Sequence, residues 1–175
     1  YLLQRDDVDH EAAGIIGICG WGGIALNAAA LDTRIKATLA STPYVMTRVA
    51  TKGYFDADDS ADKRMAARQA LAAQRTVDYS NGTYERAGGV VDPLPAGVPQ
   101  FVADYHAYYK TLRGFHARSG NSTDGWNATS SLSWMNTNLL QFASEIATPV
   151  MVLHGEKAPS RYMGEGAFDL LTGDN

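Results

Sequence analysis

Three short apolar stretches have the length and the flanking turn residues of buried strands. Residues 14–19 form a continuous apolar run, residues 35–40 form a more mixed stretch that ends before a Ser-Thr-Pro turn, and residues 149–155 form a third. Continuous apolar character is typical of strands buried on both faces of a parallel sheet. We therefore predict an α/β fold in which parallel strands are flanked by helices.

The first apolar stretch ends abruptly in small residues. The glycine-rich residues 20–23 interrupt it, and residues 24–31 are rich in alanine and leucine, which favours a helix. Residues 35–40 then provide the next strand. The order is strand, tight turn, helix and strand, which predicts a βαβ unit.

Helical patterns fill the long interval between the second and third strands. Ser60 can cap a helix over residues 61–75, and residues 100–112 predict a second helix with aromatic residues on one side. Residues 136–146 predict a third helix, and we find no convincing inner strand in the interval. The interval therefore has the character of an insertion.

The chain divides into three segments of one domain. Residues 1–48 hold the core βαβ unit, residues 49–147 form a helical, lid-like insertion, and residues 148–175 return to a core strand and helix. Three strands make a small sheet, so we expect an incomplete domain, a fragment of a longer protein. Its exposed sheet edges and apolar surface would favour self-association, including a homo-oligomer.

Composition narrows the classes of partner. Hydrophobic residues make up 45% of the chain, enough for a core, and the net charge of −4 comes without any Lys/Arg-rich stretch that could follow a nucleic acid. No segment approaches the roughly 20 apolar residues of a membrane span. The single cysteine, Cys19, excludes multi-cysteine metal sites and fits a cytoplasmic protein, with secretion left open. We expect neither a metal nor a cofactor.

A sharp strand-to-helix turn is a setting for nucleophilic catalysis. It exposes one side chain and directs the free N–H groups of a helix N-terminus at a developing oxyanion. The segment GICGWGG at residues 17–23 has this form, and it resembles the α/β-hydrolase superfamily, more narrowly the bacterial dienelactone-hydrolase-like group with its G-I-C-x-x-G-G turn. Residues 109–116, 133–136 and 152–162 look like further segments of that group.

The resemblance implies a partial α/β-hydrolase fold and a hydrolase, such as an esterase, that acts on an ester or related acyl bond of a small molecule. If Gly23 ends the elbow, Trp21 occupies the nucleophile position and the Gly22 N–H is an oxyanion donor. If Cys19 is the nucleophile, as in dienelactone hydrolases, Gly17 fits before it but Trp21 stands where a glycine is expected. A third interpretation makes Cys19 a small buried residue at a strand end.

The other members of a hydrolase triad are displaced or missing. The resemblance places an aspartate where this chain has Ala158, and Glu156 is the nearby carboxylate that could serve as a displaced acid. The family histidine follows one further strand, and all four histidines precede that point: His10, His106, His116 and His154. The alternative function is therefore a non-catalytic hydrolase-like scaffold that binds a small ligand or a protein partner.

Three residues of the insertion are candidates for substrate binding. His116, Arg118 and Trp126 could line a pocket over the sheet, with Arg118 suited to a substrate carboxylate through two parallel hydrogen bonds. The alternative is that these groups attach an irregular lid to the core. The sequence leaves both interpretations open.

Overall fold

The computed structural model describes residues 1–173, which form two compact units. One, here called the sheet unit, consists of Tyr1–Asp59 together with the residues from Met135 onward. The other, here called the helical unit, is Ser60–Trp134. Residues 174 and 175, the end of the predicted last segment, lie outside the described residues.

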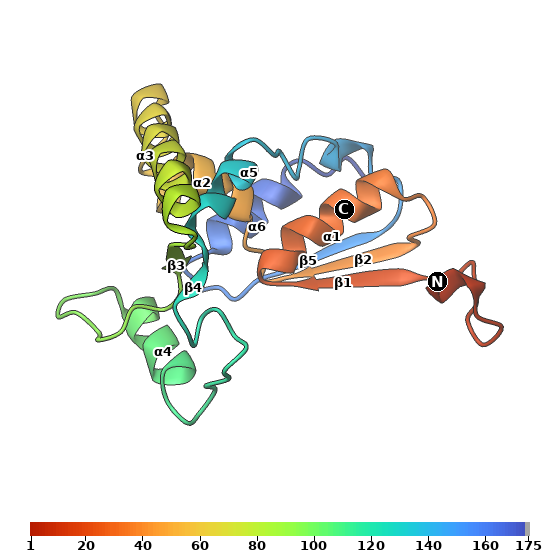
Figure 1. Cartoon of the computed structure of the whole chain (residues 1–175). Helices are drawn as coiled ribbons and strands as arrows, with labels where there is room; N and C mark the ends of the chain where they lie inside the picture. Colours follow the sequence, from red (N-terminus) through yellow and green to blue (C-terminus); the bar gives the residue numbers. More distant parts are fainter. Residues whose placement is uncertain (174–175) are drawn as a thin grey trace. The chain divides into compact units, whose positions relative to one another are not determined.

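The sheet unit contains a three-stranded parallel sheet in the order β1-β2-β5, which confirms the predicted α/β fold. Its strands are β1 (Gly14–Ile18), β2 (Ala37–Ser41) and β5 (Val150–Leu153). Helix α1 (Gly20–Leu31) connects β1 to β2 and lies along one face of the sheet (Figure 1). The three apolar stretches are therefore the three strands.

Short helices complete the sheet unit: η1 (Leu2–Gln4), α2 (Met46–Lys52), η2 (Tyr54–Asp56), η4 (Ala143–Glu145) and α6 (Arg161–Phe168). The prediction of an α-helix over residues 136–146 is wrong, since only the single 3-10 turn η4 forms there. The Asn138 side chain explains part of this difference, because its Oδ1 accepts a hydrogen bond from the Leu140 N–H at 3.3 Å and so competes with helical bonding.

The hydrophobic core lies on the face of the sheet that carries Ala40. Leu26 and Ala29 of α1 pack there with Ile146 and with Ala167 of α6. Leu26 and Ala167 are fully buried. Because residues from α1, β2 and α6 share this one cluster, the core holds both helices on one face of the sheet.

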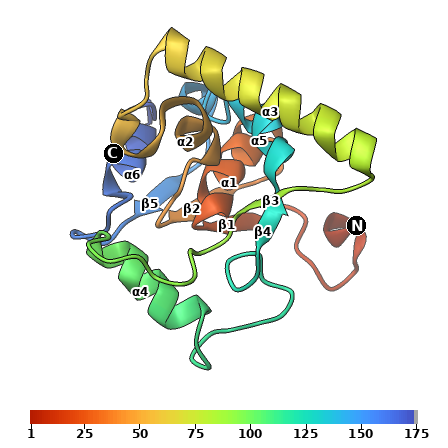
Figure 2. The same ribbon diagram turned by 60° about the vertical axis from the view of Figure 1, so that its left-hand side comes forward.

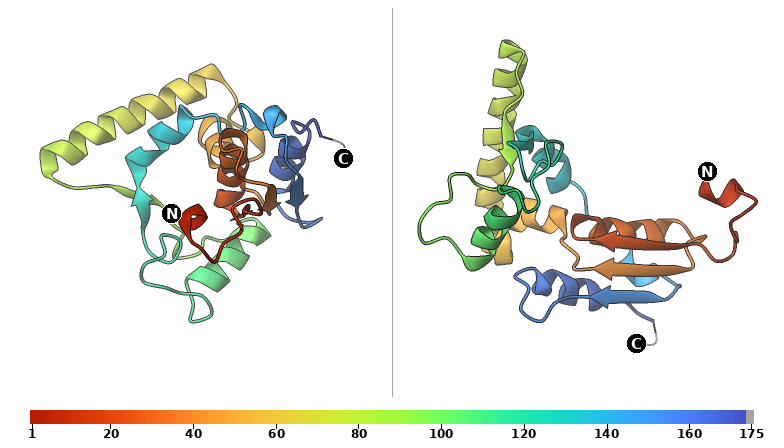
Figure 3. Two further views of the ribbon diagram at one scale, coloured as in Figure 1. Left: turned by 90° about the vertical axis from the view of Figure 1, so that its right-hand side faces the viewer. Right: turned by 90° about the horizontal axis from the view of Figure 1, so that it is seen from below.

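The opposite face of the sheet is exposed in the described chain, so the prediction of strands buried on both faces is wrong for residues 1–173. Ile16 and Ile18 of β1 are 68% and 61% exposed, and Met151 and Leu153 of β5 are 63% and 54% exposed. Viewed from this side, the three strands lie next to one another (Figure 3). Along each strand, successive residues therefore alternate between the core and an exposed apolar surface.

The helical unit is built on the long helix α3 (Ala61–Asn81) (Figure 2). The predicted cap is confirmed, because Ser60 Oγ accepts a hydrogen bond from the Lys63 N–H at 3.2 Å. The helix continues beyond its predicted end to Asn81 and is capped by Gly82, whose φ of 64° is left-handed.

The other helices of the helical unit are α4 (Gln100–Tyr109), η3 (Ala128–Ser130) and α5 (Ser131–Met135), whose last residue belongs to the sheet unit. The unit also contains two short strands that the sequence did not predict. Strands β3 (Arg86–Gly88) and β4 (Gly125–Asn127) pair in an antiparallel arrangement. Strands of three residues leave almost no apolar pattern to detect. Among residues 1–173, none of the helices combines the length and apolar character that a bilayer span requires.

Candidate functional site

The chain turns sharply at Cys19, at the carboxyl edge of the sheet. This residue caps α1 and has φ 56° and ψ −123°, a conformation that side-chain-bearing residues rarely adopt. The helix begins at Gly20, four residues before its predicted start at residue 24. The chain therefore changes from strand to helix within a single residue.

Backbone hydrogen bonds hold Cys19 in this conformation. Its N–H donates to the Ser41 carbonyl at 3.0 Å, and its own carbonyl accepts from the N–H groups of Gly22 and Tyr44, both at 2.9 Å. Strained residues persist only where their surroundings over-determine them. These three bonds connect Cys19 to its own helix, to the last residue of β2 and to the loop after β2, and they supply that constraint.

Two glycines make the turn sterically feasible. A Cβ atom on Gly17 would lie 2.6 Å from the Ala25 Cβ, and one on Gly22 would lie 2.7 Å from the Pro43 Cα. Both distances are shorter than real carbon contacts, so the helix could not approach the strand and the following loop with larger residues here. By contrast, a Cβ on Gly23 would meet its nearest neighbour at 3.6 Å, an ordinary contact.

The thiol of Cys19 is exposed, so its interpretation as a small buried residue is wrong. Trp21, which stands where a glycine is expected in the family turn, is 68% exposed. A side chain at position 19 or 21 is thus accessible, but only Cys19 combines exposure with the positive φ of the turn.

The hydrogen-bond pattern corrects the predicted oxyanion donor. The Gly22 N–H is already bonded to the Cys19 carbonyl and is not available to a ligand. The first N–H groups of an α-helix have no acceptor within the helix, and here these belong to Gly20 and Trp21. Of the two, the Gly20 N–H immediately follows Cys19.

The segment after β5 carries the predicted acid and a strand-end histidine. Glu156 is exposed, and its carbonyl accepts a hydrogen bond from Arg161 Nη1 at 3.3 Å. His154 Nε2 lies 3.1 Å from Ser160 Oγ, and its buried Nδ1 has no hydrogen-bond partner. Burial, followed by the nearby charge of Arg161, lowers the pKa of His154 below its ordinary value.

No histidine hydrogen-bonds to the Cys19 thiol within residues 1–173. The contacts of the four lie elsewhere: His10 with the Arg5 carbonyl, His106 with Asp92, His116 with the Arg118 N–H, and His154 with Ser160. Among the same residues, no cluster of three or more His, Cys, Asp or Glu side chains is placed to hold a metal ion.

Tyr44, which no local sequence pattern singles out, lies directly beside the elbow, because its N–H bonds to the Cys19 carbonyl. Tyr44 follows β2 and lies near Cys19, and its ring is 5.9 Å from that of Tyr54. Tyr162 of α6 lies under the Arg48 guanidinium at 4.9 Å. The position of Tyr44 could have marked it as a site residue. It follows the carboxyl end of a strand, and ligands of parallel α/β sheets bind beyond these ends.

The three predicted substrate-binding residues all belong to the helical unit. His116 and Arg118 are exposed and are joined by a 3.2 Å hydrogen bond from the Arg118 N–H to His116 Nδ1. Trp126 lies on β4, with its ring packed where Gly88 and Gly120 leave room. Their contacts fix the local loop, and their role in substrate binding stays a prediction.

Comparison with solved structures identifies the fold as that of α/β hydrolases. The α/β hydrolase GrgF from Penicillium sp. sh18 matches with a TM-score of 0.65 at 16% identity, over 97% of this chain and 55% of that chain. DcsB, solved in complex with its substrate analogue, matches with a TM-score of 0.64 at 17% identity, over 95% of this chain and 55% of that chain.

A more similar protein is PA2218, an uncharacterized protein of Pseudomonas aeruginosa. It is 45% identical over 171 residues, which cover 96% of this chain and 45% of that protein. Its crystal structure matches with a TM-score of 0.89 at 43% identity, over 96% of this chain and 52% of that chain. The chain thus spans about half the length of these relatives. No family model matches it.

Proposed function

We propose that this protein hydrolyses an ester or related acyl bond of a small molecule, with Cys19 as the nucleophile. The observation that supports this most strongly is the conformation of Cys19, which is exposed at a one-residue strand-to-helix turn with φ 56° and ψ −123°. A nucleophile in such a turn is accessible to substrate and adjoins the free N–H groups of a helix.

The proposed reaction has two steps. The Cys19 thiolate attacks the acyl carbon, a carbon–sulfur bond forms, and the alcohol leaves with a proton to give a thioester. Water then attacks the thioester, releasing the carboxylic acid and restoring the thiol. In both steps the Gly20 N–H, next after the nucleophile, would donate a hydrogen bond to the oxyanion.

Glu156 is the candidate acid, displaced from the position of Ala158, and it follows the carboxyl end of β5. Within residues 1–173, none of the four histidines forms a hydrogen bond with the thiol. We therefore assign the general base to a group outside residues 1–173. The relatives are about twice as long as this chain, which leaves room for such a group.

We also propose that this protein belongs to the dienelactone-hydrolase-like subgroup. A cysteine rather than a serine at the turn, preceded by Gly17, supports it. The substrate would be a small molecule, and a cytoplasmic location would keep the thiol reduced. His116, Arg118 and Trp126 remain candidates for binding a substrate carboxylate.

A second candidate function is a non-catalytic scaffold that binds a small ligand or a protein partner. It is favoured by one observation, the absence of any histidine hydrogen-bonded to Cys19 among the described residues. Under this hypothesis the exposed thiol would react slowly with alkylating agents and the protein would not turn over esters.

An esterase assay on the full-length protein distinguishes the two functions. With p-nitrophenyl acetate we expect turnover that falls by at least about 1,000-fold in Cys19→Ala. Iodoacetamide labelling followed by mass spectrometry of the peptide that contains Cys19 reports the reactivity of this thiol directly. No turnover together with an unreactive Cys19 would favour the scaffold.

Glu156 is tested against a matched neighbour. Glu165 is also exposed, and its carboxylate pairs with Arg161 at 2.8 Å. We expect Glu156→Gln to lower kcat by at least about 10-fold, whereas Glu165→Gln leaves it within about 2-fold. Equal effects of the two substitutions would remove Glu156 from the proposed mechanism.

A further inference from the structure

The His154 imidazole lies between the end of β5 and α6. His154 is the first residue after β5, and its Nε2 lies 3.1 Å from Oγ of Ser160, the N-cap of α6. Its ring packs against Gly164 of the same helix, where an added Cβ would lie 2.6 Å from Nδ1 of the histidine. This single side chain therefore connects the two ends of the loop formed by residues 155–160.

The two ring nitrogens of His154 have different surroundings. Nδ1 is buried and has no hydrogen-bond partner among residues 1–173, whereas Nε2 bonds to Ser160. A neutral imidazole carries one proton, and on Nδ1 it would be a buried donor without an acceptor. We therefore assign the proton to Nε2, which donates to Ser160 Oγ. An imidazolium carries a proton on both nitrogens, so the charged ring would have to leave Gly164 to expose Nδ1 to water.

The charges around His154 do not offset this cost. The ring lines a surface hollow of about 490 Å³ together with four charged residues, Glu156, Arg161, Glu165 and Asp169. The Glu165 carboxylate is engaged by Arg161 Nε at 2.8 Å. Burial is the main cause that lowers the pKa of His154, and Arg161 lowers it further by more than Glu165 raises it.

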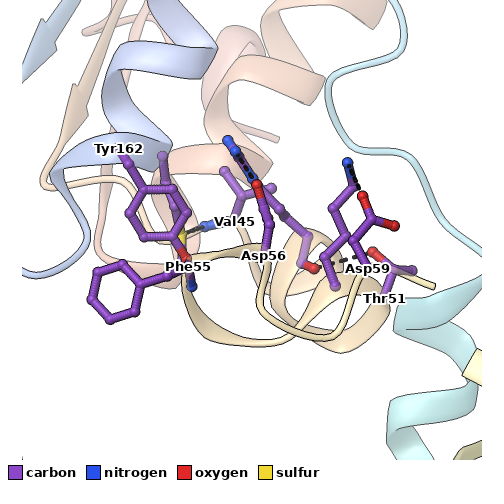
Figure 4. A network of polar contacts seen from close by, with 9 residues as sticks. Val45, Thr51, Phe55, Asp56, Asp59 and Tyr162 are labelled. Carbon is purple, nitrogen blue, oxygen red and sulfur yellow. Dashed lines mark hydrogen bonds and ion pairs between the residues drawn. The ribbon is translucent and has the colours of Figure 1, made fainter. Parts of the chain in front are cut away.

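Helix α6 is held to the rest of the sheet unit by contacts that do not involve His154. The Val45 N–H donates to Met163 Sδ at 3.2 Å, and the Phe55 N–H donates to Tyr162 Oη at 3.0 Å (Figure 4). Met163 is also fully buried. Movement of the His154 ring would therefore release the loop of residues 155–160 and leave the helix in place.

We propose that His154 is a pH-sensitive switch, whose neutral ring holds the loop of residues 155–160 between β5 and α6 and whose protonation releases that loop. The switch goes beyond the proposed function, because packing and hydrogen bonds alone build it. Since the loop carries Glu156, its release would also displace the candidate acid.

The direction of the pH effect follows from the lowered pKa. Above the ordinary pKa of histidine, His154 is neutral in both the folded and the unfolded chain, and its contribution to stability is complete. As the pH falls below that value, the unfolded chain binds the proton first. The contribution is therefore lost progressively until the pH passes the lowered pKa of the folded protein.

Hydrogen exchange of the full-length protein, followed by mass spectrometry, measures the release directly. The reporters are the N–H groups of Ala158 and Arg161, which donate to the carbonyls of Gly155 and Ala158 at 3.1 and 3.0 Å. Their protection factor, which corrects for the intrinsic effect of pH on exchange, is expected to fall by at least about 5-fold between pH 7.5 and pH 5.5. The Asp169 N–H, bonded to the Glu165 carbonyl at 2.9 Å, should keep its protection.

Two variants separate His154 from the other titrating groups. His154→Gln keeps an amide nitrogen close to the position of Nε2 but cannot be protonated, so its protection factors should agree within about 2-fold at the two pH values. His10→Gln is the matched control, because His10 is exposed and bonds to the Arg5 carbonyl. It should retain the full pH-dependent fall.

A protection factor that is independent of pH in the unsubstituted protein overturns the inference, as does a fall that His154→Gln retains. If His154→Gln does not fold, Ser160→Ala replaces it and should lower the protection by about 3-fold at pH 7.5, and unchanged protection there overturns the inference. Neither ester turnover nor Cys19 enters these measurements. A failure of the proposed function therefore leaves this result interpretable, and a failure of the switch leaves the proposed function standing.

Discussion

The backbone strain at Cys19 predicts an unusual stability change. At φ 56° and ψ −123° a Cβ atom is crowded by the backbone, whereas glycine adopts positive φ freely. Replacing Cys19 by glycine should therefore relieve strain. Replacing it by alanine should keep the strain, because alanine retains the Cβ.

The magnitude follows from two opposing terms. A residue held in a sparsely populated region costs about 1–3 kcal/mol, which glycine would regain. Glycine in turn loses about 0.5–1 kcal/mol more conformational entropy on folding than alanine. The thiol is exposed, so little burial is lost in either variant. We expect Cys19→Gly to be more stable than Cys19→Ala by about 1 kcal/mol, with both variants inactive.

Urea denaturation of the full-length protein, followed by circular dichroism, measures this difference. The matched control is the same pair of substitutions at Asp169, an exposed residue with φ −60° and ψ −19°. There the order should reverse, because alanine suits that conformation better than glycine. If glycine is the less stable variant at both positions, the turn at Cys19 is not strained and the reasoning is refuted.

Three further predictions concern single side chains, each measured by urea denaturation. Gly17→Ala should destabilise the fold by about 1–3 kcal/mol because the added Cβ would overlap Ala25. Gly23→Ala should be neutral or stabilising, because a Cβ fits there. Equal losses of stability in the two variants would contradict the packing argument. Arg48 lowers the pKa of Asp56, so Asp56→Asn should cost about 1 kcal/mol above pH 4, a cost that disappears as the pH falls through the lowered pKa; a pH-independent cost would argue against the ion pair. Ser60→Ala should cost about 1 kcal/mol through loss of the α3 cap, and no change in stability would mean that the cap is dispensable.

The strands and the helix after the first strand could be predicted because their signals are local. Apolar runs bounded by glycine and proline marked β1, β2 and β5, and the run of alanines marked α1. Local patterns failed where side chains compete with the backbone, as at Asn138, and where elements are too short to carry a period, as in β3 and β4.

The candidate site was only partly predictable. Cys19 could be selected from its glycine-rich surroundings, but cysteine has no preference for positive φ, so its conformation was not expected. Tyr44 was missed because its proximity to Cys19 depends on the pairing of β1 with β2, which places Ile18 opposite Ser41. The close approach of Gly22 to Pro43 likewise depends on tertiary packing that no local pattern contains.

The sequence by itself determined the class of fold and the place of the sharp turn, because apolar runs and glycines act on the chain within a few residues. The tertiary structure alone decided that the thiol at that turn is exposed, that the Gly22 N–H is occupied, and that Tyr44 adjoins Cys19. The reason is that a positive φ at cysteine is unfavourable in isolation. It is maintained by hydrogen bonds to Ser41 and Tyr44, which only the assembled sheet brings within reach.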